Sequence, residues 1–552
     1  MAEGSARRRT VVCLGGALFA LFASLGHEAQ RLTASGGLGA SDMRHVLLTA
    51  AILFIPASLI LALLLRGLCP HPVPKKDGAE QSDCARGRGI VRGGRSNGLA
   101  RLFGQPFSTK RAFWFILLCY APMFVVAFPG SFAYDVPFQL KQAFTGEYST
   151  HHPLLHTLVL SACVALGKLA GHVNLGAALY TALQCAAMAL CFALTCASIA
   201  RQASARAARW SAVFFALYPL NMIFAVNATK DSLFAALFAL SLALACEISA
   251  TSATSRRACV RLCVCTALML LLRNNAIYAA AAWVLVLLLM LRKRARVLAG
   301  VAALSIALAM AANGALSLAT QAGKGDLSEM LSWPIQQLAR VRLTRGDALT
   351  DEEREAVDEL MPGEAWRLYM PGISDPVKFE FDTQALLRDP ARYARVYLSV
   401  GAKCAHEYLD AILLHTYAFF YPYSEYRVAV AYASIAAYDE SSDYYDGWWE
   451  GELIQNAFPR LISALSWRVG AQGAMQFPAI GWLLNMGVIV WVMLFFLLRE
   501  AYAGRWARFA AASLCLLLWG TYLLGPVMMG RYIYPFACAL PVLASKPAAK
   551  DN

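Results

Sequence analysis

Seven polar side chains, spread over four short segments, have the chemistry of a site that handles phosphate or transfers protons. They are two carboxylates, two histidines and three cations: Asp135, Asp231, His151, His152, Lys230, Arg273 and Arg531. A carboxylate can accept a proton as a general base, and a guanidinium pairs with phosphate through two hydrogen bonds. Carboxylate and imidazole also suit divalent metal ions, which makes four of these side chains candidate metal ligands: Asp135, His151, His152 and Asp231.

The segment from Phe128 to Leu158, FPGSFAYDVPFQLKQAFTGEYSTHHPLLHTL, carries the first of these groups. It is polar and rich in aromatic residues, yet it lies between hydrophobic runs. Between Asp83 and Glu247 the chain has three acids, and two of them, Asp135 and Glu147, lie here. Ionisable residues beside membrane segments are candidates for a functional site.

Each of these residues also has a purely structural interpretation. Asp135 can cap a short helix that begins near Pro137. Lys230 and Asp231 can form a self-neutralising helix start, because an acid is favoured at a helix N-terminus. The cations Arg273 and Arg531 can extend their charged ends from the bilayer to its surface. Spacing alone does not decide between these interpretations. A shared site requires that the membrane segments bring all four motifs to the same side of the bilayer.

Composition assigns the chain to the all-α polytopic membrane proteins. Of its 552 residues 59% are hydrophobic and 15% are charged, whereas soluble domains are about 25% charged. Many apolar runs reach the length of about 20 residues that crosses a bilayer as a helix. The sequence predicts about twelve crossings in a plasma (cell) membrane.

Charge is distributed unevenly along the chain. Residues 319–475 hold 23 Asp and Glu against 14 Lys and Arg, and the remainder holds 12 against 35. Short basic loops beside apolar runs mark the cytoplasmic side. This places both termini in the cytoplasm and the acidic segment, which we call the acidic domain (319–475), on the extracytoplasmic side. The positive charges that make up the net charge of +14 are therefore explained by the orientation of the protein in the lipid bilayer. We expect no nucleic-acid partner.

The same rule divides the chain into five parts. These are a pair of transmembrane helices (1–67), a basic cytoplasmic linker (68–111), a transmembrane module (112–318) with an extracytoplasmic loop (129–172), the acidic domain, and C-terminal transmembrane helices (476–552). Arginines at 201–209 fall inside only if residues 153–169 lie along the outer interface instead of crossing. That position would bring His156 near Asp135.

With this topology, four motifs reach the extracytoplasmic face: YDV with HHP, TKD, LRNN and GRYIYP. The pattern of motifs resembles the GT-C superfamily of polytopic glycosyltransferases, in a divergent bacterial-type branch. It consists of PGSFAYD, then HHP sixteen residues after the aspartate, then the second acidic motif KD, and then the two later motifs LRNN and GRYIYP. The likeness covers about 112–318, where seven crossings are predicted, and the acidic domain that follows. The crossings in 11–67 lie outside it.

The resemblance implies transfer of a sugar from a polyprenyl-phosphate carrier to an extracytoplasmic glycan, lipid or protein acceptor, with inversion. By resemblance, Asp135 matches the catalytic aspartate of the first outer loop, and Asp231 matches the second acidic site. The first motif here has one acid instead of a pair, so a divalent metal ion is a candidate cofactor only.

The residues' chemistry suggests how such a reaction would be divided among them. Asp135 would act as the base, and a low-dielectric boundary is expected to raise its pKa. The cations Lys230, Arg273 and Arg531 would stabilise the leaving phosphate, and the pair His151 and His152 would bind phosphate or metal. The acidic domain, with its aromatic segment 417–449, would hold the acceptor.

Two other functions fit the same sequence. A transporter or flippase of lipid-linked glycans would be polytopic as well, but it would place its ionisable groups near the middle of the membrane. A non-catalytic GT-C-like subunit would keep the fold without the reaction.

Overall fold

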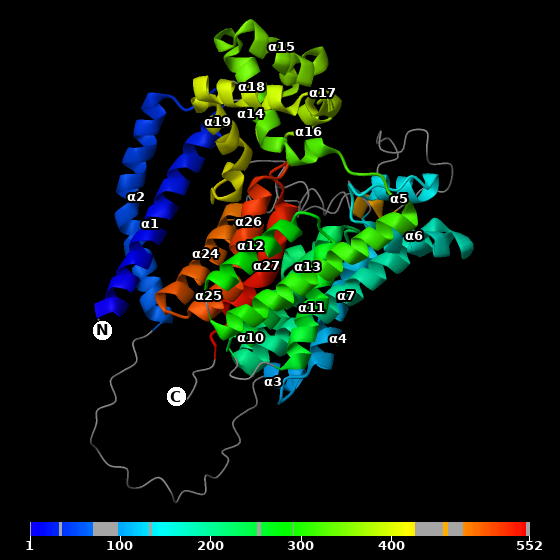
Figure 1. Cartoon of the computed structure of the whole chain (residues 1–552). Coiled ribbons are helices and arrows are strands. Elements are labelled where there is room, and N and C mark those ends of the chain that lie inside the picture. Colours follow the sequence, from blue (N-terminus) through cyan, green and yellow to red (C-terminus); the bar gives the residue numbers. More distant parts are fainter. Residues whose placement is uncertain are drawn as a thin grey trace, which may run out of the picture.

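The computed structural model describes residues 2–32, 36–69, 98–131, 135–250, 255–290, 292–424, 456–461 and 478–547 (Figure 1). These residues form helices joined by turns and loops, and β-pairing among them is confined to isolated bridges. The prediction of an all-α protein is therefore confirmed for the part of the chain that the structure describes.

Seven helices in the described ranges are long and apolar enough to cross a membrane. They are α1 (Ala2–Arg31), α2 (Ala40–Leu68), α4 (Thr109–Val126), α7 (Val173–Gln202), α10 (Lys230–Ala250), α13 (Lys293–Thr320) and the consecutive pair α25 (Trp506–Ala512) and α26 (Leu514–Leu523). An eighth span results if α8 (Ala205–Leu217) and α9 (Pro219–Val226) count together. These two meet at an angle of 55°, because Pro219 disfavours helical geometry in the residue before it.

The other apolar runs also fold as helices, but shorter ones of 14 to 17 residues. They are α11 (Arg256–Leu271), α12 (Ala276–Leu289), α24 (Met486–Tyr502) and α27 (Gly530–Ala544). The break between α11 and α12 falls at 272–275, the residues of the LRNN motif. The structure thus supports a polytopic membrane protein, while the predicted count of twelve crossings is not confirmed. Two short helices complete this part, α3 (Gly98–Phe103) and α23 (Pro478–Leu484).

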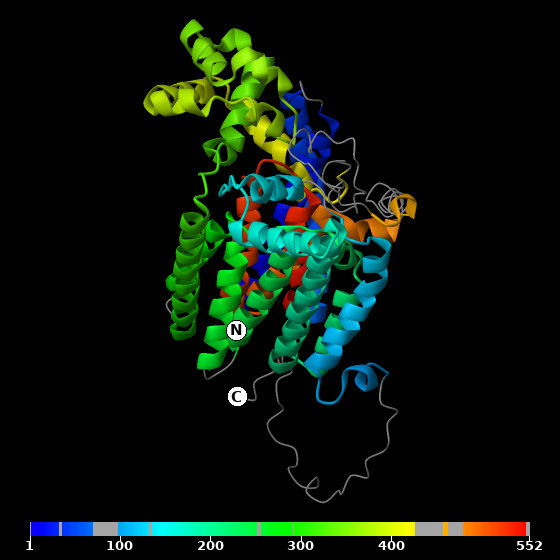
Figure 2. The same cartoon turned by 90° about the vertical axis from the view of Figure 1, so that its right-hand side faces the viewer.

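Two cyan helices, α5 (Asp135–Thr145) and α6 (Leu154–Leu169), lie across the ends of more upright helices in Figure 2. Glycines allow α6 to approach α7 closely. A Cβ atom on Gly167 would lie 2.1 Å from the backbone nitrogen of Gly176, so the two helices touch backbone to backbone. The segment expected at 153–169 is present as a helix, and it runs crosswise to the more upright helices (Figure 2).

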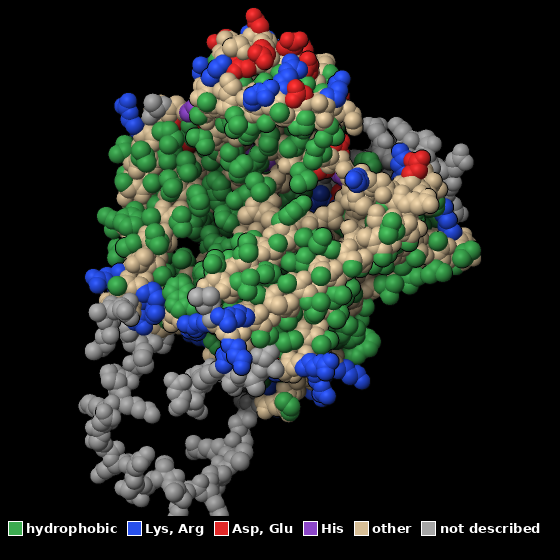
Figure 3. All heavy atoms as spheres, viewed as in Figure 1, with side chains coloured by type: hydrophobic (Ala, Val, Ile, Leu, Met, Phe, Trp, Pro, Cys, Tyr) green, Lys and Arg blue, Asp and Glu red, His purple; other side chains and the backbone are tan. Residues whose placement is uncertain are grey.

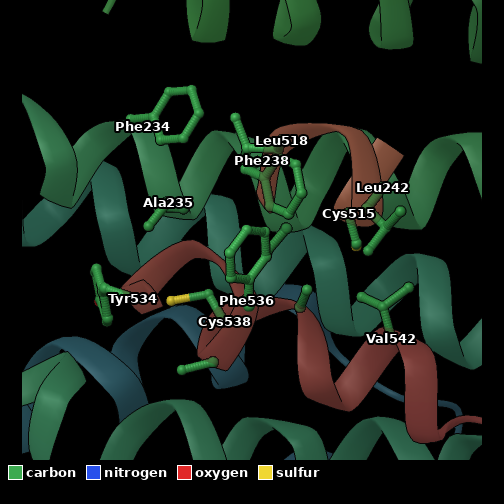
Figure 4. Packing of buried hydrophobic residues seen from close by; sticks show 14 of the residues in the cluster. Phe234, Ala235, Phe238, Leu242, Cys515, Leu518, Tyr534, Phe536, Cys538 and Val542 are labelled. Carbon is green, nitrogen blue, oxygen red and sulfur yellow. The ribbon is translucent and has the colours of Figure 1, made fainter. Parts of the chain in front are cut away.

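Helix α10 lies at the centre of the bundle. Most of its surface is buried, chiefly against α7 and α27. Figure 4 shows Phe238 of α10 facing Phe536 of α27, with ring centroids 6.2 Å apart in an edge-on arrangement. Leu518 of α26 packs nearby. This apolar packing fixes the position of α10, and its N-terminus carries Lys230 and Asp231.

The acidic domain has a hydrophobic core of its own, separate from that of the bundle. It contains α14 (Ser332–Thr344), α15 (Asp351–Leu360), α16 (Asp375–Lys378), α17 (Thr383–Arg388), α18 (Pro390–Lys403) and α19 (Ala405–Thr416). The acidic stretch DEEREAVDEL forms α15, and its start is fixed by a capping box between Thr350 and Glu353. Residues 425–449 of the predicted aromatic segment lie outside the described residues.

Charge is segregated between the two ends of the molecule (Figure 3). The visible charged side chains at the lower end of the view are Lys and Arg, whereas the acidic domain at the top carries most of the visible Asp and Glu together with further Lys and Arg. The start of α1 and the end of α27 both lie toward the basic end (Figure 1). The charge asymmetry of the sequence is thus an asymmetry of the folded molecule.

Candidate functional site

The five charged residues among the seven candidates meet at the end of the bundle that faces the acidic domain. Each lies at the end of a helix or in a turn. Asp135 is the first described residue of α5, Lys230 and Asp231 begin α10, Arg531 is in the first turn of α27, and Arg273 lies between α11 and α12. Residues separated by up to 396 positions in the chain come into direct contact here.

A short backbone pairing brings the starts of α5 and α10 together. The Ser131 amide donates to the Val226 carbonyl at 2.9 Å, and the Ala228 amide donates to the Ser131 carbonyl at 2.8 Å. Ser131 and Asn227 form a parallel bridge. Each strand-like segment leads into a helix a few residues later, which places Asp135 beside Lys230.

One oxygen of Asp135 accepts from two cations. The Lys230 Nζ atom lies 2.7 Å from Asp135 Oδ2, and Arg531 Nη1 lies 3.1 Å from the same atom. The three side chains are 20%, 15% and 12% exposed, in the order Asp135, Lys230, Arg531. Each of these side chains therefore keeps a small part of its surface in contact with solvent, while most of its surface is buried.

The pKa of Asp135 does not follow the sequence-based expectation. Burial alone would raise the pKa of this carboxyl, but the charges of Arg531 and Lys230, with His152, outweigh burial and hold the pKa well below its usual range. The expectation of a raised pKa is wrong because it considered the low-dielectric boundary and omitted the two cations. In this arrangement Asp135 is a stable anion and a weak base.

The second carboxylate is more deeply enclosed. Asp231 has no exposed side-chain surface, and it forms an ion pair with Arg273, which is 8% exposed. The guanidinium of Arg273 lies 4.6 Å and 4.5 Å from the ring centroids of Tyr522 and Tyr532. These contacts hold Arg273 in place through attraction between its charge and the ring faces.

Arg531 connects the two carboxylates. Its Nη1 atom contacts Asp135, and its Nε atom lies 3.7 Å from Asp231 Oδ2. The cluster thus forms a continuous chain of charges from Lys230 to Arg273. Neither of the two tyrosines beside Arg273 is among the site residues that the sequence predicts. Tyr532 belongs to the motif GRYIYP, but nothing in the sequence around Tyr522 signals this position.

The two adjacent histidines have different surroundings. His152 is buried, and its Nδ1 atom lies 3.4 Å from Lys230 Nζ. Burial, and then the Lys230 charge, lower the pKa of His152 well below its usual range, so it is neutral. His151 points to Glu329 of the acidic domain, with 3.9 Å between Nδ1 and Oε1. Only His152 therefore joins the charged cluster.

His156 has a packing role. Its Nδ1 atom lies 3.1 Å from Gln139 Oε1, and its Nε2 atom lies 2.6 Å from the Tyr180 hydroxyl. Because Gln139 is on α5, the contact confirms that His156 lies near the helix of Asp135. Both ring nitrogens have partners, and the network binds α5, α6 and α7 together.

The acidic domain contacts both sides of the cluster. On one side, the Thr150 amide donates to the Gly323 carbonyl at 2.9 Å, just before the two histidines. On the other side, the Ser374 amide donates to the Pro526 carbonyl at 2.8 Å, and Ile373 forms a bridge with Val527. Residue 527 lies four positions before Arg531. The fold of the acidic domain therefore helps to set the positions of His152 and Arg531.

The charge of the cluster favours an anion over a metal ion. Two carboxylates face three cations, and His152 is neutral, so the cluster has one positive charge in excess (3 − 2 = 1). The residues do not fit a divalent ion, because Lys230 lies between Asp135 and His152. Among the described residues no group of three His, Cys, Asp or Glu side chains is arranged to hold a metal. A phosphate oxyanion suits the arginines and the lysine.

One family model matches most of the chain. Residues 144–550 match the model of a family of unknown function, DUF6020. The match contains six of the seven candidate residues and begins nine positions after Asp135 (144 − 135 = 9). No curated protein and no solved structure matches the chain.

Proposed function

The chain belongs to the DUF6020 family, and we propose that it is a membrane glycosyltransferase. It transfers a sugar from a polyprenyl-phosphate carrier to a hydroxyl of a glycan, lipid or protein acceptor. One observation carries this proposal. A carboxylate that solvent can reach lies beside an excess of buried positive charge, where the ends of apolar helices meet.

The reaction needs a base and a place for the leaving phosphate. The acceptor oxygen attacks the anomeric carbon from the face opposite the phosphate, and the carbon–oxygen bond to phosphate breaks with inversion. The hydroxyl proton passes to Asp135, and the phosphate keeps the bonding electron pair. Lys230 and Arg531 stabilise the charge that develops on it, because fixed cations in a dry site lower the energy of such a transition state.

Asp231 takes a supporting role in this scheme. Its carboxylate is fully buried, so it orients Arg273 and Arg531 and does not touch the acceptor. His152 lies beside Lys230 and can donate to the phosphate as a neutral imidazole. His151, which faces Glu329, belongs to the contact between the cluster and the acidic domain.

The charge distribution supports an orientation for the enzyme. Basic residues gather at the end opposite the acidic domain (Figure 3), which is the pattern of a cytoplasmic face. The site would then open on the extracytoplasmic face of the cell membrane, with both termini in the cytoplasm. The carrier lipid would reach the site from the bilayer, and the acceptor would arrive beneath the acidic domain.

Two alternatives remain, and one observation bears on each. A flippase or transporter needs ionisable groups at the middle of the membrane, whereas this cluster lies at helix ends. A non-catalytic binding subunit would suit the ion-paired state of Asp135, because a carboxylate held by two cations is a weak base. The activity assay separates this second alternative from the enzyme.

The test follows sugar transfer in reconstituted vesicles. Purified full-length protein is supplied with radiolabelled polyprenyl-phosphate hexoses and a membrane extract as acceptor. Asp135→Asn keeps the size of the side chain but removes the proton acceptor, so the rate should fall by roughly 10²–10⁴-fold. Asp358→Asn, on α15 within the acidic domain, is the matched control and should retain the wild-type rate. No transfer by the wild type, or an unchanged rate in Asp135→Asn, would refute the proposed role.

A further inference from the structure

The two cations best placed for a donor phosphate already hold an anion. Lys230 and Arg531 both contact Oδ2 of Asp135, at 2.7 Å and 3.1 Å. A carboxylate oxygen and a phosphate oxygen accept the same hydrogen bonds from these groups. Asp135 therefore occupies the place that the phosphate would take.

We propose that Asp135 is a built-in competitor of the donor phosphate: the phosphate displaces it from Lys230 and Arg531, and only the displaced carboxylate is a competent base. The inference rests on the proposed function and adds regulation of the same site. The base is weak while the site is empty, and it gains proton affinity when the donor binds.

The groups around Asp135 determine how its proton affinity responds. It faces Lys230 of α10, Arg531 of α27 and the neutral His152 of the loop before α6. Both charged neighbours are cations, and both favour the ionised form. A bound phosphate or sulfate would take over their hydrogen bonds and would add negative charge close to the carboxylate. Each change favours protonation of Asp135.

The second ion pair remains in place during this exchange. Asp231 and Arg273 are 0% and 8% exposed, and the rings of Tyr522 and Tyr532 enclose the guanidinium. Separating such a buried pair is costly, because each ion would be left without its partner. The exchange is therefore confined to the more exposed pairs of Asp135. The donor is a phosphodiester with one negative charge, so its binding cancels the excess positive charge of the cluster (1 − 1 = 0). The probe sulfate is a dianion and leaves one negative charge in excess (1 − 2 = −1).

The first test counts protons in the wild-type protein. Sulfate is the probe, because it is a tetrahedral dianion that does not titrate near neutral pH. Full-length protein in detergent is titrated with sulfate by calorimetry, in pairs of buffers with different ionisation enthalpies. Sulfate binding should take up as much as one proton within the range from about pH 4 to 7, above the ordinary carboxyl pKa of about 3.9. Binding without proton uptake throughout this range, or no binding, would overturn the proposal.

The second test measures the affinity of variants for sulfate. Asp135→Asn removes the competing anion, so it should bind sulfate at least about tenfold more tightly than the wild type. Lys230→Gln should bind it more weakly, and the distant Asp358→Asn should not change it. Weaker or equal binding by Asp135→Asn contradicts the competition. Proton uptake that persists in Asp135→Asn would come from His152, whose pKa burial and the Lys230 charge also lower, and would contradict the competition. If Asp135→Asn does not fold, loss of the uptake in His152→Asn would contradict it in the same way.

The outcomes separate this proposal from the proposed function. Proton uptake and tighter binding by Asp135→Asn, without sugar transfer by the wild type, would support an anion-binding site and reject the glycosyltransferase. Sugar transfer without proton uptake would support the enzyme and reject the competition by Asp135. Both results together would support an enzyme whose base becomes active when the donor binds.

Discussion

Replacing Arg273 with glutamine should destabilise the protein strongly. The guanidinium is 8% exposed and its partner, Asp231, is fully buried, so the substitution leaves a carboxylate without its nearest cation. Removing one partner of a buried pair costs about 3–5 kcal/mol. The Arg531 Nε atom at 3.7 Å and the Thr229 hydroxyl at 3.3 Å remain beside Asp231. We therefore expect a loss near the lower limit, about 3 kcal/mol of unfolding free energy.

The assay is denaturant unfolding of the full chain in detergent, followed by tryptophan fluorescence. Arg342→Gln is the control, because its pair with Asp358 is partly exposed, at 18% and 42%, and should contribute less than about 1 kcal/mol. The double variant Arg273→Gln/Asp231→Asn should be more stable than the sum of the single effects predicts, because no buried charge is then left unpaired. Equal losses for Arg273→Gln and Arg342→Gln, or strict additivity, would refute this account of the pair.

Three further predictions concern pH, packing and orientation. The folded-state pKa of Asp135 is lowered, so the ionised carboxylate stabilises the folded protein at pH values above the unfolded pKa of about 3.9. This stabilisation is lost as the pH falls through the lower folded-state pKa. In acid unfolding measurements, Asp135→Asn should therefore lose less stability than the wild type over this pH range. Gly176→Ala should cost about 1–3 kcal/mol in thermal or denaturant unfolding, because its Cβ atom would lie 2.3 Å from the Cys163 carbonyl oxygen. Single cysteines in 319–424 should react with impermeant reagents from outside intact cells, and labelling only after permeabilisation would reverse the proposed orientation.

The sequence alone determined the class of protein and much of its helical layout. Apolar runs and their basic flanks are local features, so they predict helices whatever packs against them. The separate segment expected at 153–169 is present as the helix Leu154–Leu169. The sequence also indicated which polar residues to examine, because ionisable groups are rare in its apolar part.

Only the tertiary structure decided what those polar residues do to one another. Arg531 is 396 positions from Asp135, and contact between them depends on how α27 packs against α10 and where the acidic domain holds the loop before it. That contact reversed the expected direction of the Asp135 pKa, because nearby charges outweighed burial. The fold also separated His151 from the cluster and joined His152 to it. The proton affinity of a side chain depends on the charges within a few ångströms of it. Those charges come mostly from residues far away in the sequence, so their distances are set by the tertiary fold.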